Sequence, residues 1–275
     1  MTPFSRLTPD DAAACLELSQ AEDWPHRIED WQMMLNLGQG WGLVRKNRLI
    51  ATGILMRHGT RDANLGGIIV HAEWRRRGLA RQLVAHLLEQ APDAHCHLNA
   101  TESGAPLYRQ MGFRDDGLVQ QFQGQVVSDQ PRMTPDMATA EDLPELVTLD
   151  RAATGMSRLA LLTVLQQQGH VNIQRSRTRP GIDCAIFVRR FGLGEILGPV
   201  LCTQQADPGP LMEMTLAQHA GRFLRIDIAE AGAPLIPLVR EAGLEHVGRA
   251  VSMNRGAHYR LRSARHMALA SQALG

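Results

Sequence analysis

Apolar positions in the first half of the chain recur first at helical spacing and then in the alternation that strands show. Residues 10–19 (DDAAACLELS) have the helical spacing, and the preceding Thr8 and Pro9 are typical of a helix start. Residues 26–37 (HRIEDWQMMLNL) form a second helical segment, which Gly38 closes. The elements predicted after it are two strands around a turn at Lys46 and Asn47, a strand at 65–70, a helix at 79–90, a strand at 94–100, a helix at 103–111 and a final pair of strands.

The second half follows a polar segment, 128–135 (SDQPRMTP), whose two prolines make it a poor interior for a helix or a strand. Its predicted elements are helices at 140–151 and 157–168 and strands at 183–189 and 195–201. Residues 258–274 have helical spacing, and we expect a helical tail that docks on the second half with Arg260, Arg262 and Arg265 facing solvent. The predicted domains are therefore residues 1–130 and 131–275.

The two halves align with each other at a constant offset of 131 residues. TPDDA (8–12) falls on TAEDL (139–143), LGGIIV (65–70) on ILGPVL (196–201), RRRGLA (75–80) on ADPGPL (206–211) and APLYRQMGF (105–113) on IPLVREAGL (236–244). Four segments that share one offset indicate an internal repeat. The second copy replaces three arginines and gains two prolines in one segment, and it has Val239 in place of Tyr108. We expect it to keep the fold and to have lost a site.

Residues 65–83 (LGGIIVHAEWRRRGLARQL) run from an apolar strand through three arginines into an amphipathic helix. Gly78 lets the backbone approach an anion closely because it has no Cβ, and the N–H groups of 79–81 open the helix at the end that favours negative charge. The arginines at 75–77 add charge-assisted donors. A solvated basic turn is the alternative, but the strand before and the helix after favour a phosphate-binding loop.

The spacing Arg75-x-x-Gly78-x-Ala80 resembles the acyl-CoA pyrophosphate loop of the GCN5-related N-acetyltransferases, the GNAT family. Residues 98–113 (LNATESGAPLYRQMGF) are similar to the family's fifth strand with its asparagine and to the following helix with its tyrosine. The resemblance covers residues 4–127, and the whole chain resembles a bacterial subgroup with a second, degenerate domain. It implies an α/β (α+β) class with two tandem acyl-CoA N-acyltransferase folds, each a mixed, mostly antiparallel sheet with helices on both faces.

The resemblance also implies the chemistry, which is direct attack of an amine on acetyl-CoA in a ternary complex at residues 1–130. A backbone N–H near Ile69 and Val70, where the fourth strand bulges in this family, would polarise the carbonyl oxygen. Tyr108 would be the general acid, since a phenol is protonated at neutral pH; a ring that only packs beside the cofactor is the alternative. The residues implied to contact acetyl-CoA are Ile68, Ile69, Val70, Arg75, Arg76, Arg77, Gly78, Leu79, Ala80, Asn99 and Tyr108.

The general base has no strong candidate in the sequence. Some family members carry a glutamate on the fourth strand, and counting back from the arginine loop puts Asn64 at about that position, with Asp62 and Glu73 nearby. His71 directly after the strand could take the role, although a histidine there is more often a polar surface group. A bound water relay, or a lower amine pKa caused by desolvation, could also compensate.

The acceptor in this family usually enters beside the first two helices and the last hairpin, here around Glu22, Asp23, Trp24 and Gln121. Two carboxylates and an indole would suit a cationic amine, and ordinary loop polarity explains these residues equally well. The expected acceptor is a primary amine of a small molecule or of an exposed peptide. The missing base and the degenerate second copy suggest an alternative, a non-catalytic acyl-CoA-binding or regulatory interaction protein.

Composition limits the classes of partner that we expect this protein to bind. The net charge is +1, with −2 in residues 1–130 and +3 in the remainder, so neither half has the charge of a nucleic-acid-binding protein. His95 and His97 share a strand face but lack further ligands, so we expect no metal. No stretch approaches 18 consecutive apolar residues, so no membrane span is expected. Four separated cysteines without a C-x-x-C pair (Cys15, Cys96, Cys184 and Cys202) suggest reduced thiols in a cytoplasmic protein, a monomer or a homodimer.

Overall fold

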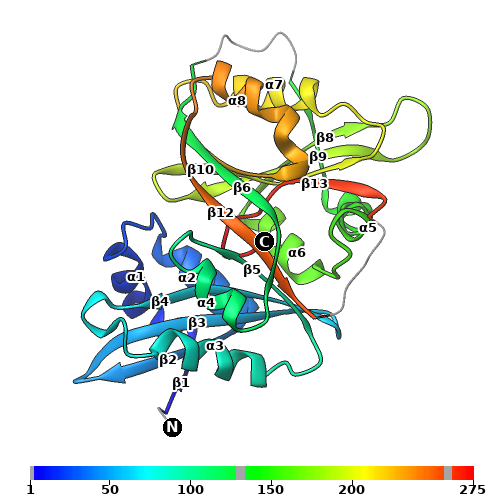
Figure 1. Ribbon diagram of the computed structural model, residues 1–275. Coiled ribbons are helices and arrows are strands. Elements are labelled where there is room, and N and C mark those ends of the chain that lie inside the picture. Colours follow the sequence, from blue (N-terminus) through cyan, green and yellow to red (C-terminus); the bar gives the residue numbers. More distant parts are fainter. Residues whose placement is uncertain (1–2, 128–133, 257–261) are drawn as a thin grey trace. The chain divides into compact units, whose positions relative to one another are not determined.

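The computed structural model describes residues 3–127, 134–256 and 262–275 (Figure 1). It divides into two compact units. The first comprises Met1–Asp116, Ser252–Ala257 and Ala273–Gly275, and the second comprises Gly117–Val251 and His258–Gln272. Neither unit is one continuous stretch of the chain, because late segments belong to the first unit.

The first unit is a mixed, mostly antiparallel sheet with helices. In chain order its elements are β1 (Ser5–Leu7), η1 (Pro9–Asp11), α1 (Ala12–Gln20), α2 (Ile28–Leu37), β2 (Gln39–Arg45), β3 (Arg48–His58), β4 (Asp62–Val70), η2 (Ala72–Trp74), α3 (Leu79–Glu89), β5 (His95–Ala100) and α4 (Ala105–Gln110). The strands are ordered β1-β2-β3-β4-β5, with β4 and β5 parallel. The predicted hairpin is confirmed, because Lys46 and Asn47 both have positive φ between β2 and β3.

The second unit has the same kind of sheet. Its elements are β7 (Asp136–Met137), η3 (Ala140–Asp142), α5 (Leu143–Thr154), α6 (Leu159–Gln168), β8 (Gly169–Arg175), β9 (Ile182–Phe191), β10 (Gly194–Thr203), α7 (Gly209–Gln218), β11 (Phe223–Ala229), η4 (Glu230–Leu235), α8 (Ile236–Glu241) and β13 (Ala264–Ala268). Two long strands contribute residues to both units, β6 (Arg114–Gln125) and β12 (Glu245–Arg255). The prediction of a strand pair directly after α4 is wrong, since β6 alone spans that region.

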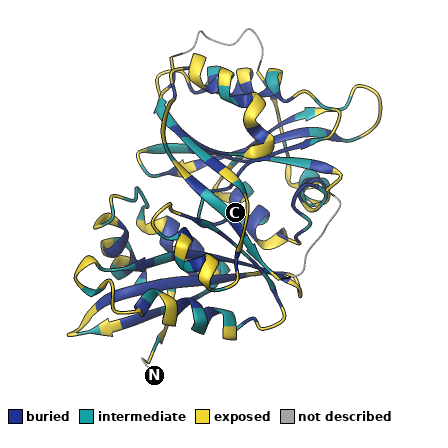
Figure 2. Ribbon diagram, in the orientation of Figure 1, coloured by how far each residue is buried: buried dark blue, intermediate teal, exposed yellow. Residues whose placement is uncertain are grey.

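The repeat is visible in the element boundaries. Helices α2 and α6 begin at Ile28 and Leu159 and end at Leu37 and Gln168, which are 131 residues apart at both ends. Strands β6 and β12 share one pattern of buried and exposed positions over the length of β12 (Figure 2). The repeated hydrophobic pattern in the sequence therefore forms the same helices and strands in both copies.

The helical tail is not formed. Residues 257–261 lie outside the described part of the chain, and Ala264–Ala268 form strand β13 between β10 and β11. Burial explains the error: Met267 through Ser271 are all buried, which suits a strand covered on both faces and not an amphipathic helix. Arg265, expected to face solvent, donates to the backbone oxygens of Thr203 and Ala206.

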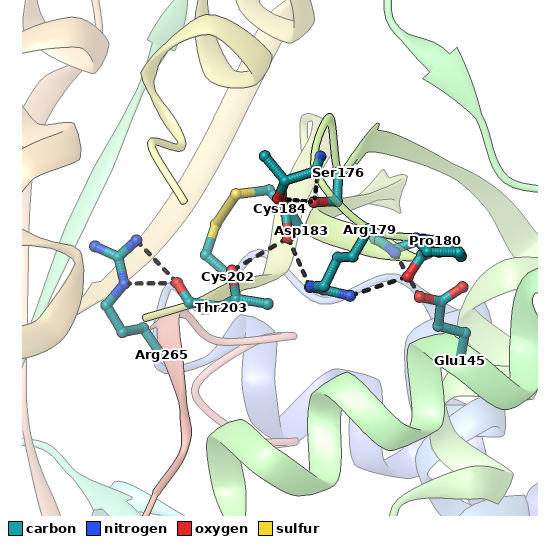
Figure 3. A network of polar contacts seen from close by, with 11 residues as sticks. Glu145, Ser176, Arg179, Pro180, Asp183, Cys184, Cys202, Thr203 and Arg265 are labelled. Atoms are coloured by element: carbon teal, nitrogen blue, oxygen red, sulfur yellow. Dashed lines mark hydrogen bonds and ion pairs between the residues drawn. A yellow bond between two sulfur atoms is a disulfide. The ribbon is translucent and has the colours of Figure 1, made fainter. Parts of the chain in front are cut away.

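Two of the four cysteines are joined, contrary to the expectation of reduced thiols. Cys184 on β9 and Cys202 on β10 are direct partners in the antiparallel register, and a disulfide links them. Figure 3 shows Asp183 and Thr203 beside the disulfide, with Arg265 of β13 donating to the Thr203 oxygen. Cys15 and Cys96 are buried free thiols.

Candidate active site

The predicted phosphate-binding loop connects β4 to α3 in the first unit. Gly78 is the N-cap of α3 and has φ +74°, a left-handed conformation in which a Cβ would be strained. Gly78 has no side chain with which to cap α3, so as the N-cap residue it leaves the N–H groups of the first turn to other partners. Such a helix end favours a negatively charged ligand.

Two of the three arginines in this loop bind other groups of the chain. Arg75 donates from Nε to the Val70 oxygen at 3.0 Å and forms an ion pair with Glu22. Arg77 donates to the Glu73 oxygen at 3.1 Å, and its guanidinium lies 4.9 Å from the centre of the Trp74 ring. These contacts brace the loop, so an anion would share these two guanidinium groups with their present partners.

Strand β4 bulges at Gly67 and Ile68, just before Ile69 and Val70, where the family resemblance led us to expect the bulge. Thr52 pairs with Ile69 and Ile54 pairs with Gly66, so Gly53 faces two residues, Gly67 and Ile68. Gly67 has φ +59°, and a Cβ at this position would come within about 3.0 Å of the buried Trp31 ring. A bulge leaves one strand residue out of the regular ladder, and its N–H can then serve a ligand.

Strands β4 and β5 separate next to this bulge. Their parallel register joins Asp62–Asn64 to His95–His97 and continues no further along the described strands. The loop to α3 begins at the end of β4, on the same side as the divergence. Ile68, Ile69 and Val70 therefore lie on the separated part of β4, as the predicted cofactor contacts require.

Tyr108 lies on α4 and is buried, with 8% of its surface exposed. Its ring meets Phe113 edge to face at 5.9 Å between centroids. Burial raises the pKa of the phenol to about 12, so Tyr108 carries its proton at neutral pH. Asn99 on β5 is half-buried, and it shares a strand face with His95 and His97, while Cys96, Leu98 and Ala100 are buried on the other face.

The residues at and near the expected position of the general base make other contacts. Asn64 is buried and donates from Nδ2 to the Leu274 oxygen at 2.7 Å. The Asp62 carboxylate is 3.8 Å from Nε2 of His97. His71 accepts a hydrogen bond at Nδ1 from the Glu73 N–H at 3.4 Å and caps η2.

The four candidate acceptor residues do not form one cluster within a unit. Glu22, Asp23 and Trp24 follow α1 in the first unit, and the Glu22 carboxylate is paired with Arg75. Asp23 has φ +56°, which marks a tight turn. Gln121 belongs to the second unit, where its side chain bonds with Gln123 and Gln272.

The corresponding loop of the second unit offers an anion fewer hydrogen-bond donors. Asp207 accepts a hydrogen bond from the Gly209 N–H at 2.9 Å at the start of α7. Pro208 and Pro210 have no N–H groups to offer. The carboxylate and the two prolines therefore remove the donors that an anion would use.

The sequence did not reveal that Ala273–Gly275 lie in the first unit against β4. The nearest signal is the uncharged run ALASQALG at 268–275, whose small apolar residues suit a buried extended segment. Among the described residues no three His, Cys, Asp or Glu side chains are grouped to hold a metal ion. Nor is any helix in that part of the chain both long and apolar enough to cross a membrane.

Comparison with known proteins agrees with this geometry. Sequence models of the acetyltransferase (GNAT) domain match the chain twice, at residues 37–115 and 146–267. The chain is a tandem member of the GNAT family. It is 26% identical over 165 residues to the uncharacterized N-acetyltransferase YitH of Bacillus subtilis, a match that spans 58% of each protein.

Solved GNAT structures share the fold at low identity. A Pyrococcus horikoshii protein assigned to the acetyltransferases has a TM-score of 0.80 at 17% identity. The match covers 99% of this chain and 95% of the Pyrococcus chain. A tandem GNAT protein from the clavulanic acid biosynthesis pathway has a TM-score of 0.63 at 17% identity and covers 94% and 99%. Membership in GNAT supports an acyltransferase activity and an amine-bearing acceptor.

Proposed function

We propose that the first unit of this GNAT protein transfers an acetyl group from acetyl-CoA to a primary amine of a small molecule or an exposed peptide. The observation that carries the proposal is the start of α3 at Gly78, placed directly after the divergence of β4 and β5. The helix start suits the pyrophosphate. The separated strands leave the β4 backbone available to the pantetheine arm and the thioester.

Stabilisation of the carbonyl oxygen and protonation of the leaving thiolate each have a group in this unit. The amine lone pair attacks the thioester carbonyl carbon, and a backbone N–H of β4, at the bulge of Gly67 and Ile68 or at the adjoining Ile69 and Val70, stabilises the charge that develops on the carbonyl oxygen. The carbon–sulfur bond then breaks, and the Tyr108 hydroxyl donates its proton to the departing thiolate. The proton lost by the amine passes to solvent.

Acetyl-CoA binding without catalysis is the second candidate, and Asn64 favours it. An amide at the position where some relatives carry a glutamate cannot accept a proton at neutral pH. Calorimetric titration with acetyl-CoA, followed by an acetyl-transfer assay with a panel of primary amines, separates the two candidates. We expect one binding site per chain and transfer to at least one amine. Binding without transfer to any amine would favour the second candidate, and absence of binding would reject both.

Tyr108→Phe tests the assigned acid. It keeps the ring against Phe113 and removes only the hydroxyl, so acetyl-CoA affinity should stay unchanged. We expect kcat to fall about 10²- to 10⁴-fold, the usual contribution of a general acid. Steady-state kinetics and calorimetry on the same preparation measure both quantities. Full activity in this variant would show that Tyr108 only packs beside the cofactor.

A further inference from the structure

The end of the tail reaches the catalytic strand of the first unit. Ala273–Gly275 belong to that unit, although β13 shortly before them belongs to the second. Leu274 is buried, and its backbone oxygen accepts the hydrogen bond from Nδ2 of Asn64 on β4. The contact joins residues that are 210 positions apart in the sequence.

Gly66 permits this approach. A Cβ on Gly66 would overlap the carbonyl oxygen of Ala273, so only glycine leaves space for the tail at this point of β4. Asn64 and Gly66 lie two residues apart on the strand and share one face of it. The tail therefore covers this face of β4 immediately before the bulge at Gly67 and Ile68.

The hydrogen bond fixes which way the Asn64 amide points. A carbonyl oxygen can only accept, so the Leu274 oxygen selects the NH₂ group of the amide and turns Oδ1 the other way. Oδ1 is buried and has no hydrogen-bond partner among the described residues. A buried acceptor without a partner is costly, and a ligand N–H that reaches Oδ1 would remove this cost.

The position of Asn64 suggests which ligand this is. Asn64 is the last residue of β4 in register with β5, and the bulge that would hold the thioester carbonyl begins three residues later. The acceptor amine must approach the thioester carbon with its lone pair free and its N–H groups directed elsewhere. A hydrogen-bond acceptor beside the bulge orients the amine in this way.

We propose that Oδ1 of Asn64 binds an N–H of the acceptor amine and that Ala273–Gly275 position its amide for this task. The inference rests on the proposed transfer activity and adds an acceptor-binding residue together with the segment that orients it. The proposal predicts that the reacting nitrogen of the acceptor carries an N–H as well as its lone pair, as the nitrogen of a primary amine does.

Asn64→Leu and deletion of Ala273–Gly275 test the proposal, alone and combined. Asn64→Leu is nearly isosteric and removes the acceptor oxygen. We expect kcat/KM for the amine to fall on the order of 10- to 100-fold, the loss that corresponds to one buried hydrogen bond. The deletion should lower it less. The combined variant should be no worse than Asn64→Leu, because the tail acts through Asn64. Affinity for acetyl-CoA should stay the same in all three.

Gly66→Ala provides an independent displacement of the tail, and Gly248→Ala is its matched control. A Cβ at Gly248 meets nothing within 4 Å, so this control should behave as the unmodified protein. Gly66→Ala should reduce amine kcat/KM and leave acetyl-CoA affinity unchanged. Thermal melting of every variant checks that it is folded.

Several results would overturn the proposal. Equal amine kinetics in Asn64→Leu and the unmodified protein would reject the acceptor role of Asn64. Additive effects of the deletion and Asn64→Leu would reject the positioning role. A changed shape of the pH–rate profile in the deletion variant, instead of a uniform loss, would show that the tail supplies the base. An unmodified protein that transfers no acetyl group would reject this inference and the proposed function together.

Discussion

The two units differ at the point where a pair of parallel strands separates. In the first unit β4 and β5 pair over three residues and then separate. In the second unit β10 and β11 also pair over three residues, Glu195–Leu197 with Leu224–Ile226, and β13 then lies between them. It pairs with β10 over Val200–Thr203 and meets β11 at Ile228. The divergence that could admit a cofactor in one copy is closed in the other by a strand of the chain itself.

The starts of α3 and α7, the helices that follow β4 and β10, also differ between the two units. The N-cap of α3 is Gly78, which has no side chain to cap the helix, whereas the Asp207 carboxylate accepts a hydrogen bond from the Gly209 N–H at the start of α7. In the second unit a strand and a carboxylate therefore occupy positions that the first unit leaves to other partners. The helices and strands around the two sites remain the same.

The largest difference in stability should come from a buried ion pair present in one copy. Asp150 and Arg158 are both buried, and Nε of Arg158 lies 3.0 Å from the carboxylate. Asp150→Ala leaves the guanidinium uncompensated and should cost about 3–5 kcal/mol of unfolding free energy. The equivalent residue 131 positions earlier is Ser19, which accepts a hydrogen bond from Trp31 Nε1. Ser19→Ala should cost less, about 1–3 kcal/mol. Urea unfolding measures both, and equal losses would contradict the comparison.

A smaller effect is expected at the α3 start. Gly78 and Gly221 have φ of +74° and +78°, and no atom comes closer than 3.7 Å to a Cβ built at either site, so alanine at either should cost about 1–2 kcal/mol of strain. Only Gly78→Ala should also weaken acetyl-CoA binding, because Gly78 opens α3 in the first unit and Gly221 belongs to the second unit. Thermal melting and calorimetry compare the two variants. Weakened binding in Gly221→Ala would place the cofactor elsewhere.

Strand β13 should make the second unit sensitive to acid. Burial holds the pKa of His266 well below its usual range, and the positive charges of Arg158 and Arg262 lower it further. Below the ordinary histidine pKa of about 6.5, the unfolded chain binds a proton that the folded chain excludes. Stability should therefore fall as pH falls through this window, by at most about 1.4 kcal/mol per pH unit. His266→Gln should flatten the dependence, and His246→Gln at an exposed site should not.

The smallest expected effect is that of uncapping α7. Asp207→Ala frees the Gly209 N–H but leaves β13 between β10 and β11. The number of acetyl-CoA sites per chain should therefore stay at one in a calorimetric titration. A second site in this variant would mean that the carboxylate, and not the strand, had closed the second copy.

The sequence predicted those parts of the fold that depend on local pattern. Helical spacing located α2 and α6, and the Lys46–Asn47 turn located the β2–β3 hairpin, because neighbouring residues determine both kinds of element. The tail was predicted wrongly because its residues are buried on both faces of a sheet. Its apolar spacing reflects contacts with β10, about 60 residues earlier, and not a helix period.

The candidate site shows the same limit. The arginine loop and Tyr108 come from motifs in which spacing carries the information. The engagement of Arg75 by Glu22 and of Asn64 by Leu274 joins residues 53 and 210 positions apart. The Cys184–Cys202 pair likewise follows from strand register. No pattern in a single sequence reports such contacts, since they exist only once the strands are aligned.

Strand β13, which lies between β10 and β11, is part of the same chain as the second unit. The stability of the two units should therefore depend differently on the concentration of small molecules in the cell. A tethered segment is present at a fixed effective concentration, so β13 occupies its position in the second unit at any concentration of free ligand. A diffusible ligand stabilises its host by an amount that grows with its concentration. If the first unit binds acetyl-CoA, its resistance to unfolding will rise and fall with the supply of that cofactor, while the second unit provides a constant reference within the same chain.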